Sequence, residues 1–258
     1  MIKIFDTTYD VSDIISQYLT DSIQRQLLAT MSESTEIYQY DSVDQLIFEI
    51  TLRKETAEAA ELLNKSRFAF AVFYQSRCNP IYWDRTQNGG FRLKWGAKPA
   101  DAINNIYIDG ELYATECATA MLIVYYKALI QVYGEEQFNN TFTNIYLMNW
   151  HNIETLFREV GNPVHVHDIL IGDRCYIINP DVSPQYPECQ GENVIVLGNG
   201  LYYGHGLGIT TVNNIIAELN TKRRYNSTKS AYFIESTAAR PDFKNLANIY
   251  LRSASIST

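Results

Sequence analysis

Hydrophobic and polar positions along the chain predict helices in residues 1–66 and mainly short strands after them. The sequence SVDQ at residues 42–45 is a capping-box pattern, and it opens a long helical run, LIFEITLRKETAEAAELLNKS. The aromatic runs FAFAVFY (68–74), IYWDR and FRLKW then predict strands, with a hairpin-like TQNGG between the last two. Residues 99–110 predict a short helix with proline in its first turn and glycine after its end.

The most apolar segment of the chain is residues 118–133, where every residue except Lys127 and Gln131 suits a buried helix. Gly134 stands where a glycine stop is expected. A helix that is apolar all round is a central one. Yet an acid and a thiol, Glu116 and Cys117, stand directly before it, which is costly for folding unless something offsets it.

The remaining patterns are strand-like: NIYLM (144–148), GDRCYIIN (172–179), ENVIVLG (192–198) and LYYGHGLG (201–208). A final helix, VNNIIAELNTKRR, and a strand, SAYFIES, complete the predicted core. Helices followed by an antiparallel meander predict an α+β fold, with an antiparallel sheet packed on the central buried helix. No linker-like segment or internal repeat divides the chain, so we expect one compact domain over residues 1–258.

The formal net charge of −8 argues against a nucleic-acid partner, because binding to phosphates requires a basic face. The basic cluster TKRRYNSTK (221–229) is interpreted as a solvated helix end. The N-terminus does not resemble a secretion signal, and Lys127 interrupts an apolar run that is shorter than the roughly 20 residues of a membrane span. We therefore expect a cytoplasmic protein without membrane contact.

Cys117 is the first candidate for chemistry, because backbone N–H groups and the dipole at a helix start stabilise a thiolate, the nucleophilic form of cysteine. The alternative is that Cys117 is a small buried hydrophobe. The other cysteines, Cys78, Cys175 and Cys189, have neither disulfide nor zinc spacing and are interpreted as free thiols.

A hairpin supplies the second candidate group. Asn199-Gly200 between two apolar runs is a strong signal for a type I′ turn. A regular ladder from that turn pairs Val194 with His205, which puts Glu192 and His205 on the same face as diagonal neighbours, with roughly 7–8 Å between their α-carbons. A solvated hairpin edge is the alternative, and a bulge at the glycines would move one of the two residues to the other face.

A thiol at a helix start and antiparallel strands that carry a base are the parts of a papain-like acyl-transfer site. His165 and His167 in VHVHD have strand spacing but no third metal ligand nearby, so we expect no metal site there, and no cofactor elsewhere.

Five ordered motifs extend this interpretation: YATECATAMLIVYYKALI, NIYLMNWH, GDRCYIINP, GENVIVLG and YYGHGLGI. Together they resemble the Bacillus-type spore-coat transglutaminases, the protein-glutamine γ-glutamyltransferases, over nearly the whole chain. The resemblance implies an NlpC/P60-like, papain-related core, with residues 67–258 as the catalytic core and 1–66 as a mainly helical N-terminal part. It also implies ε-(γ-glutamyl)lysine cross-links between spore coat proteins, without calcium, by an enzyme made in the sporulating mother cell and deposited on the spore coat.

The resemblance also assigns roles to residues. It makes Cys117 the nucleophile, Glu192 the general acid and base, and Glu116 an auxiliary carboxylate. His205 becomes a polar partner close to the site. For Glu116 the alternative is a helix-terminal charge that satisfies the dipole.

The implied reaction requires a glutamate to deprotonate a thiol, although an ordinary glutamate is some four pH units too acidic. We expect burial beside Val194, Tyr202 and Tyr203 to raise the pKa of Glu192. We also expect aromatic residues to keep water from the acyl-enzyme, with Trp150, Tyr202, Tyr203 and Trp95 as candidates. Ordinary core packing is the alternative for each of them.

Two other functions are compatible with such a core. A cysteine amidase or peptidase would use water as the acceptor, but its usual base would be a histidine at the position of Glu192. A coat scaffold with a relic site is disfavoured by the intact set of Glu116, Cys117, Glu192 and His205.

Overall fold

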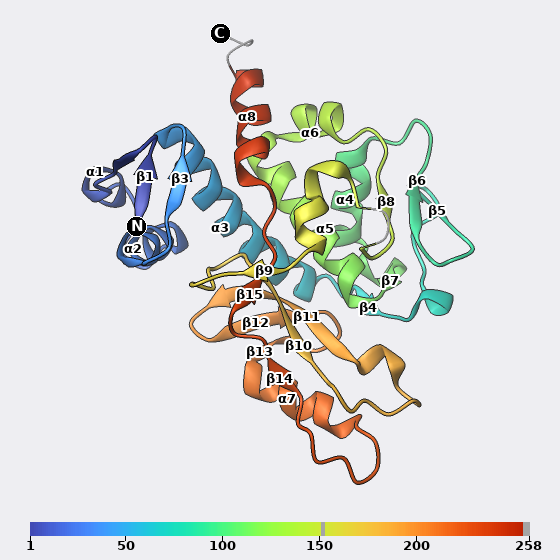
Figure 1. Cartoon of the computed structure of the whole chain (residues 1–258). Helices are drawn as coiled ribbons and strands as arrows, with labels where there is room; N and C mark the ends of the chain where they lie inside the picture. The colour runs from blue at the N-terminus through green and yellow to red at the C-terminus, as the bar shows by residue number, and fades with distance from the viewer. Residues whose placement is uncertain (151–152, 255–258) are drawn as a thin grey trace.

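One buried helix and an antiparallel sheet organise the chain, as the computed structural model shows for residues 1–150 and 153–254 (Figure 1). The α-helices are α1 (Ser12–Ile15), α2 (Ile23–Glu33), α3 (Val43–Lys65), α4 (Pro99–Ile108), α5 (Cys117–Tyr133), α6 (Glu135–Thr141), α7 (Val212–Thr221) and α8 (Phe243–Ala254). Short 3₁₀ helices are η1 (Phe73–Gln75), η2 (Gly110–Leu112), η3 (Thr155–Gly161) and η4 (Pro187–Cys189).

The strands form one larger sheet, in the order β13-β12-β11-β10-β14, and several small ones. Their bounds are β1 (Ile2–Ile4), β2 (Thr7–Thr8), β3 (Tyr38–Tyr40), β4 (Ala69–Phe70), β5 (Trp83–Arg85), β6 (Phe91–Leu93), β7 (Ala114–Thr115), β8 (Tyr146–Leu147), β9 (Val164–His165), β10 (Arg174–Ile178), β11 (Gly191–Gly198), β12 (Leu201–Gly204), β13 (Gly208–Thr211), β14 (Tyr232–Phe233) and β15 (Thr237–Ala238). All neighbouring pairs in the larger sheet are antiparallel. The predicted α+β architecture is confirmed.

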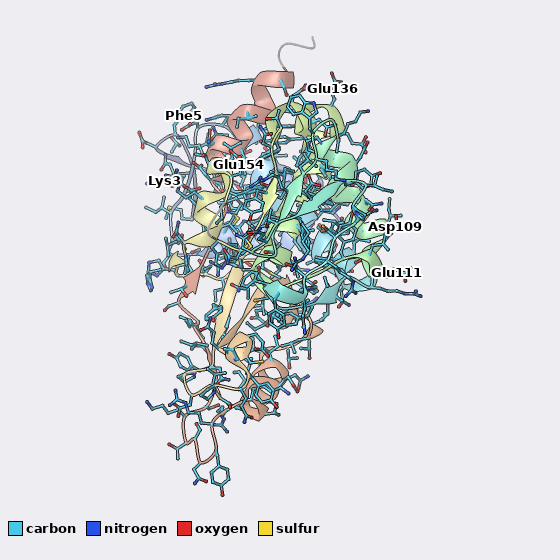
Figure 2. The ribbon with its side chains drawn as sticks, turned by 90° about the vertical axis from the view of Figure 1, so that its right-hand side faces the viewer. Lys3, Phe5, Asp109, Glu111, Glu136 and Glu154 are labelled. Carbon is cyan, nitrogen blue, oxygen red and sulfur yellow. The ribbon has the colours of Figure 1, made fainter. Side chains whose placement is uncertain are left out.

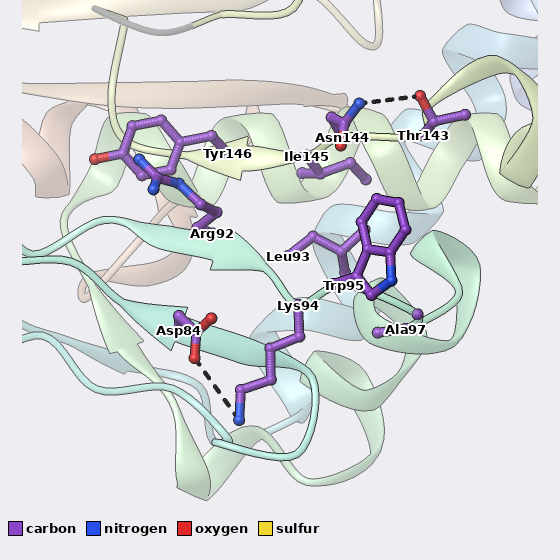
Figure 3. Close-up of a pocket in the computed structure, with 11 residues that line it drawn as sticks. Asp84, Arg92, Leu93, Lys94, Trp95, Ala97, Thr143, Asn144, Ile145 and Tyr146 are labelled. Atoms are coloured by element: carbon purple, nitrogen blue, oxygen red, sulfur yellow. Dashed lines mark hydrogen bonds and ion pairs between the residues drawn. The ribbon is translucent and has the colours of Figure 1, made fainter.

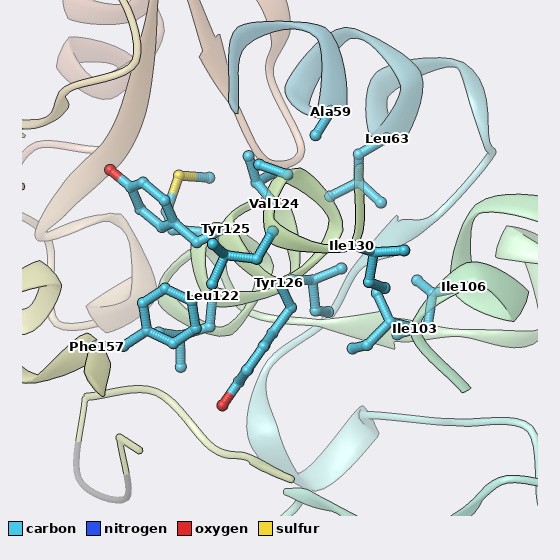
Figure 4. Packing of buried hydrophobic residues seen from close by; sticks show 14 of the residues in the cluster. Ala59, Leu63, Ile103, Ile106, Leu122, Val124, Tyr125, Tyr126, Ile130 and Phe157 are labelled. Carbon is cyan, nitrogen blue, oxygen red and sulfur yellow. The ribbon is translucent and has the colours of Figure 1, made fainter. Parts of the chain in front are cut away.

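Helix α5 is the centre of the main core, as predicted. It packs against α3, α4 and α6 and against β11 of the sheet. Figure 4 shows Leu63 of α3 and Ile103 of α4 around Val124 and Ile130 of α5. Because each buried aliphatic side chain contributes about 1.5–3 kcal/mol, this packing holds the helix and the residue at its start in a fixed place. Gly134 ends the helix with a φ of 76°.

The two faces of the larger sheet have different partners. Ile195 and Tyr203 point into the core around α5, whereas Val194 and Val196 pack with Ile215 of α7. This alternation matters for the site, because neighbouring residues of β11 reach different sides of the sheet.

Local signals in the sequence are reproduced. The Ser42 hydroxyl accepts a hydrogen bond from the backbone N–H of Gln45 at 3.3 Å, which caps α3. Pro99 stands in the first turn of α4. Both Asn199 and Gly200 have positive φ, 52° and 71°, as a type I′ turn requires.

Long-range elements differ from the prediction. The N-terminal part contains a small sheet, because β1 pairs in parallel with β3 from a distant segment. The run 68–74 forms only the short strand β4 and the 3₁₀ helix η1. The segment predicted as the final helix is α7, and α8 follows it and packs on α3. Figure 2 shows Lys3 of β1 and Phe5, the residue after this strand, on the side opposite Asp109 and Glu111.

A buried ion cluster joins α3 to the larger sheet. Arg53 donates to Glu49 at 2.8 Å and to Asp173, the residue before β10, at 2.7 Å. Arg240, from the segment before α8, also donates to Asp173. The buried charges compensate one another, so the cluster is compatible with a buried position. Its ion pairs link α3, the start of β10 and the segment before α8.

In the described ranges, no helix has the combination of length and apolarity that a bilayer crossing demands.

Candidate active site

Cys117 is the first residue of α5, and Glu116 is the N-cap of this helix. The Glu116 carboxylate accepts hydrogen bonds from the backbone N–H of Ala118 at 2.6 Å and of Thr119 at 2.8 Å, and from the Thr119 hydroxyl. These are N–H groups that a helix start leaves without partners. The acid therefore has the capping role that the sequence left as one of two interpretations.

The expected lowering of the Cys117 pKa is wrong. Burial raises the pKa of the thiol, and the negative charges of Glu192 and Glu116 raise it further. In addition, the N–H groups that were expected to stabilise a thiolate are bonded to the Glu116 carboxylate. At rest the sulfur is therefore a neutral thiol.

The direct polar contact of the sulfur comes from β11. The side-chain amide of Asn193 donates to Sγ of Cys117 at 3.3 Å. The Oδ1 atom of the same amide accepts from Nη1 of Arg174 at 2.9 Å. Arg174 is 3% exposed, and its guanidinium lies 4.8 Å from the ring of Trp150. Hydrogen bonds thus link the buried cation Arg174 through Asn193 to the Cys117 thiol, and we call these three side chains the thiol chain.

Glu192 is 7% exposed, and among the described residues its Oε1 atom has no hydrogen-bond partner. Burial raises its pKa well above the ordinary value, and the charge of Glu116 adds to this, while a hydrogen bond from the backbone N–H of His205 opposes it. The expected rise is confirmed. A carboxyl group with a raised pKa is a stronger base than an ordinary glutamate, as proton transfer from a thiol requires.

The Glu192 carboxylate is close enough to Cys117 for its negative charge to raise the pKa of the thiol, and it does so more than the charge of Glu116. In the described part of the chain no hydrogen bond joins the two side chains directly. Glu192 leaves β11 on the same side as Val194, and its Cγ lies 3.2 Å from where a Cβ on Gly204 would stand. Glycine at position 204 therefore makes room for this carboxyl group.

The register predicted for the hairpin is off by one residue. Gly198 pairs with Leu201, but a bulge between Val196 and Gly198 makes Val194 pair with Gly204 and not with His205. The extra residue of a bulge shifts every later pair to the opposite face. The regular ladder had predicted that the side chains of Glu192 and His205 share a face. Because of the bulge, they do not.

His205 is fully enclosed. Its Nε2 atom bonds to the carbonyl oxygen of Ala69 at 3.1 Å, so Nε2 carries the hydrogen and Nδ1 accepts from the Tyr203 hydroxyl at 3.1 Å. The ring stacks on Phe68 with 4.6 Å between centroids. Burial lowers its pKa to about 4, so the imidazole is neutral near neutral pH. Both nitrogens are occupied, which leaves neither for proton transfer with Cys117.

The aromatic candidates are distributed over three places. Trp150 lies over Arg174, next to the thiol chain, while Tyr203 is in the main core. Tyr202 points to the α7 side of the sheet, with its ring centroid 5.6 Å from that of Phe233. Trp95 is fully exposed and lines a separate surface pocket with Asp84, Arg92, Lys94 and Tyr146 (Figure 3).

The other candidate groups remain outside the site. His165 and His167 have ring centroids 5.7 Å apart, and the described residues contain no cluster of three or more potential metal ligands. Cys175 is buried, and Cys78 and Cys189 are half-buried free thiols.

Two side chains of the thiol chain were missed by the sequence analysis. Asn193 stands inside the motif GEN beside Glu192, and the period of two along a strand was the available signal that it faces the other way. Arg174 stands inside GDRC, where nothing in the sequence distinguishes it from a surface charge.

The comparisons with known proteins agree with one another. The profile of the family described as "Protein-glutamine gamma-glutamyltransferase" matches residues 1–250. Curated proteins with that description from Bacillus mycoides (strain KBAB4) and Bacillus cereus (strain B4264) are 39% and 41% identical to this chain. The matches cover 86% and 89% of this chain and 82% and 84% of those proteins.

A solved structure is also similar. The transglutaminase from Geobacillus stearothermophilus, without its C-terminal extension, is 44% identical and superposes with a TM-score of 0.76. The superposition covers 81% of this chain and 98% of that one, so the similarity extends over a single compact α+β domain.

Proposed function

The chain belongs to the protein-glutamine γ-glutamyltransferase family, and from this premise we propose that it acts through a thioester on Cys117 with Glu192 as the proton carrier. Its activity is that of a transglutaminase, an acyltransferase whose substrates are proteins that carry glutamine and lysine. The observation that carries the proposal is a thiol at the start of a buried helix that interacts with the charge of a buried carboxyl group, one oxygen of which has no hydrogen-bond partner among the described residues.

The first half of the reaction forms the thioester. Sγ of Cys117 attacks the γ-carboxamide carbon of a glutamine, and Glu192 takes the thiol proton. The C–N bond breaks, and Glu192 gives that proton to the departing nitrogen, which leaves as ammonia. The γ-acyl group remains on the sulfur.

The second half transfers the acyl group. The ε-amine of a lysine attacks the thioester carbon, and Glu192 takes a proton from that nitrogen. The C–S bond breaks, the proton returns to the sulfur, and an ε-(γ-glutamyl)lysine bond is formed. One carboxyl group serves both halves because its pKa is raised toward that of its partners.

The raised pKa values of Cys117 and Glu192 support this assignment together. Burial raises the pKa of both groups, and the rise for Glu192 makes this carboxylate a stronger base toward the thiol. A direct hydrogen bond between them is not needed in the free enzyme, because catalytic hydrogen bonds often tighten only when substrate binds.

Glu116 and His205 have supporting roles in this proposal. Glu116 caps α5, and its charge raises the pKa of both reacting groups. His205 is a positioning residue: its ring is anchored by Tyr203 and Ala69, and its backbone N–H donates to the Glu192 carboxylate.

Transfer to an amine requires that water be kept from the thioester. Trp150 lies next to the thiol chain and is the aromatic residue best supported as a wall. We extend this role to Tyr203 and Tyr202, which lie on strand β12 of the hairpin that carries Glu192, whereas Trp95 lies in the surface pocket of Figure 3.

The finer points follow the resemblance to spore-coat transglutaminases. We propose an NlpC/P60-like core in residues 67–258, a supporting part in residues 1–66, and glutamine- and lysine-bearing spore coat proteins as substrates. Synthesis in the mother cell and deposition on the coat belong to the same proposal.

The test is incorporation of a labelled primary amine into a glutamine-rich protein, with a chelator present to check independence from calcium. The enzyme should label and cross-link the protein. Release of ammonia without label would instead identify a hydrolase, and neither product would identify a scaffold.

Two variants test the residues. Cys117→Ala should abolish labelling while the thermal unfolding of the protein remains near that of the parent. Glu192→Gln preserves the acceptor for the His205 N–H but removes the proton carrier, so we expect a loss of roughly 10²–10⁴-fold in rate. A near-normal rate for this variant would refute its role.

A further inference from the structure

Arg174 is a buried cation that forms no ion pair with any of the residues in 1–150 and 153–254. Of the residues that the structure describes, no carboxylate lies within ion-pair distance of its guanidinium, which bonds only to the carbonyl oxygen of Val160 and to Oδ1 of Asn193. Burial lowers its pKa, but a guanidinium stays protonated at any physiological pH. Its positive charge is therefore not neutralised where it lies.

The direction of the hydrogen bonds carries the argument. Arginine has only donors, so the Asn193 side chain must turn its oxygen toward Arg174. The NH₂ group of the Asn193 side chain then faces Cys117, and because this group can only donate, the sulfur is the acceptor. The S–H proton is consequently free to point away from Asn193 and toward a base.

We propose that Arg174 is a positioning residue for the reaction: through Asn193 it holds the Cys117 sulfur as a hydrogen-bond acceptor and supplies positive charge as that sulfur becomes an anion. This inference rests on the proposed role of Cys117 as nucleophile. It explains how a thiol faced by two carboxylates can be deprotonated at all, since it adds the missing charge of opposite sign.

Other titratable groups around the sulfur set the background for this effect. They are Glu116 at the start of α5, Glu192 on β11 and Tyr176 on β10, whose pKa rises to about 12 through burial and the charges of Cys117 and Glu192. Tyr125 and Cys175 surround Arg174 on its other side. Among the described residues whose charges interact with Cys117, Arg174 is the cation.

The test measures the rate at which iodoacetamide alkylates Cys117 as a function of pH, by mass spectrometry of the peptide that contains this residue. The measurement does not depend on turnover. Arg174→Gln should move the midpoint of the profile upward by about one pH unit, which is roughly tenfold slower alkylation at a fixed pH below it. Arg174→Lys retains the charge but not the planar fork, and should recover part of the shift.

Asn193→Asp separates this role from a purely structural one. The new carboxylate would pair with Arg174 and preserve folding, but it would present an oxygen and a negative charge to the sulfur. We expect normal thermal unfolding and an upward shift larger than that of Arg174→Gln. Because Asn193→Asp should fold, its alkylation profile tests the role of Arg174 even if Arg174→Gln does not fold.

Arg92→Gln is the matched control, since Arg92 also lies over an aromatic ring, that of Tyr146 at 5.4 Å, but is away from the thiol. Its profile should equal that of the parent. The proposal is overturned if Asn193→Asp alkylates with the parent profile, or if Arg92→Gln shifts as much as Arg174→Gln.

The failure of this inference differs from a failure of the proposed function. If Cys117→Ala still incorporates amine, the nucleophile is wrong and the function as proposed falls. If Cys117→Ala is inactive while Asn193→Asp and Arg174→Gln keep the parent profile, only the role of Arg174 falls.

Discussion

Arg53 and Arg174 are both buried arginines, yet they have different surroundings. Each lies over an aromatic ring, Phe243 at 4.6 Å and Trp150 at 4.8 Å, and each has an Nη2 atom without a hydrogen-bond partner in the described part of the chain. Arg53 bonds to two carboxylates, whereas Arg174 bonds only to neutral oxygens. The comparison shows that two equally buried arginines differ in their counter-ions, and the role proposed for Arg174 depends on that difference.

The two arginines are connected through adjacent residues. Asp173 pairs with Arg53 and Arg240, and the next residue along the chain is Arg174 itself. Because neighbouring residues of an extended chain point to opposite sides, one peptide segment supplies an anchor on one side and a charge for the thiol on the other. The ion cluster thereby holds the start of β10, and with it Arg174, in place.

The largest expected effect on stability is that of Arg53→Met. It leaves Glu49 with an uncompensated buried charge and Asp173 with Arg240 as its remaining partner, which costs about 3–5 kcal/mol in the free energy of unfolding. Arg174→Met leaves only neutral acceptors and should cost about 1–3 kcal/mol. Urea-induced unfolding of both variants measures the difference, and equal losses would break the comparison.

Lowering the pH should change the contributions of Asp173 and Glu192 to the free energy of unfolding in opposite directions. Burial raises the pKa of Asp173, but the charges of Arg53 and Arg240 outweigh it and the net pKa is lowered. Its contribution to stability is therefore present above the ordinary value of 3.8 and is lost as the pH falls through the lower folded value. The pKa of Glu192 is raised, so its carboxylate lowers stability as the pH rises above the ordinary 4.5.

Glu192→Gln tests this sign. The free energy of unfolding of the variant, relative to the parent, should increase as the pH rises from about 4.5, the ordinary value for glutamate. Glu111→Gln is the control, because Glu111 is exposed and its curve should remain parallel to that of the parent. A relative stability that falls with rising pH would contradict the assignment of Glu192 as a buried carboxyl group with a raised pKa.

A smaller effect is expected for Glu116→Gln. It removes one of the two carboxylate oxygens that cap α5, which costs about 0.5–2 kcal/mol. It also removes a negative charge next to Cys117, so the alkylation profile should move to lower pH, opposite to Arg174→Gln. Thr119→Ser retains the hydroxyl that donates to Glu116 and should change neither quantity.

The smallest effect is expected for Lys54→Met, beside Arg53 on the same helix. Lys54 pairs with Glu55 and Glu58 at the partly exposed surface. Such pairs contribute little, so the free energy of unfolding should change by less than about 1 kcal/mol. A loss as large as that of Arg53→Met would show that burial of the partners is not the deciding difference.

The sequence analysis succeeded where a signal lies within a few residues. The cap of α3 at Ser42, the stop at Gly134 and the turn at Asn199-Gly200 all depend on local backbone chemistry. The position of Cys117 at the start of the central helix followed from the apolar run behind it. These features are confirmed because a helix end or a tight turn is specified by the few residues that form it.

Predictions failed where distant segments meet. The hairpin register was wrong by one residue because a bulge lies between Val196 and Gly198, where φ is 90°, which is the alternative that the glycines had left open. The pKa of Cys117 was expected to fall but rises, because burial and then the negative charges of Glu192 and Glu116 disfavour the thiolate, while Glu116 also occupies the helix N–H groups. The small sheet of β1 and β3 and the helix α8 were missed for the same reason: their partners are far away along the chain.

By itself, the sequence determined the α+β class, the central helix, the thiol at its start and the family to which the chain belongs. Only the tertiary structure decided which side chains meet that thiol, and the contacts proved to be Asn193 and, through it, Arg174. The physical reason is range: caps, turns and apolar periods act over a few residues, whereas hydrogen-bond partners, burial and pKa values depend on segments that only folding brings together.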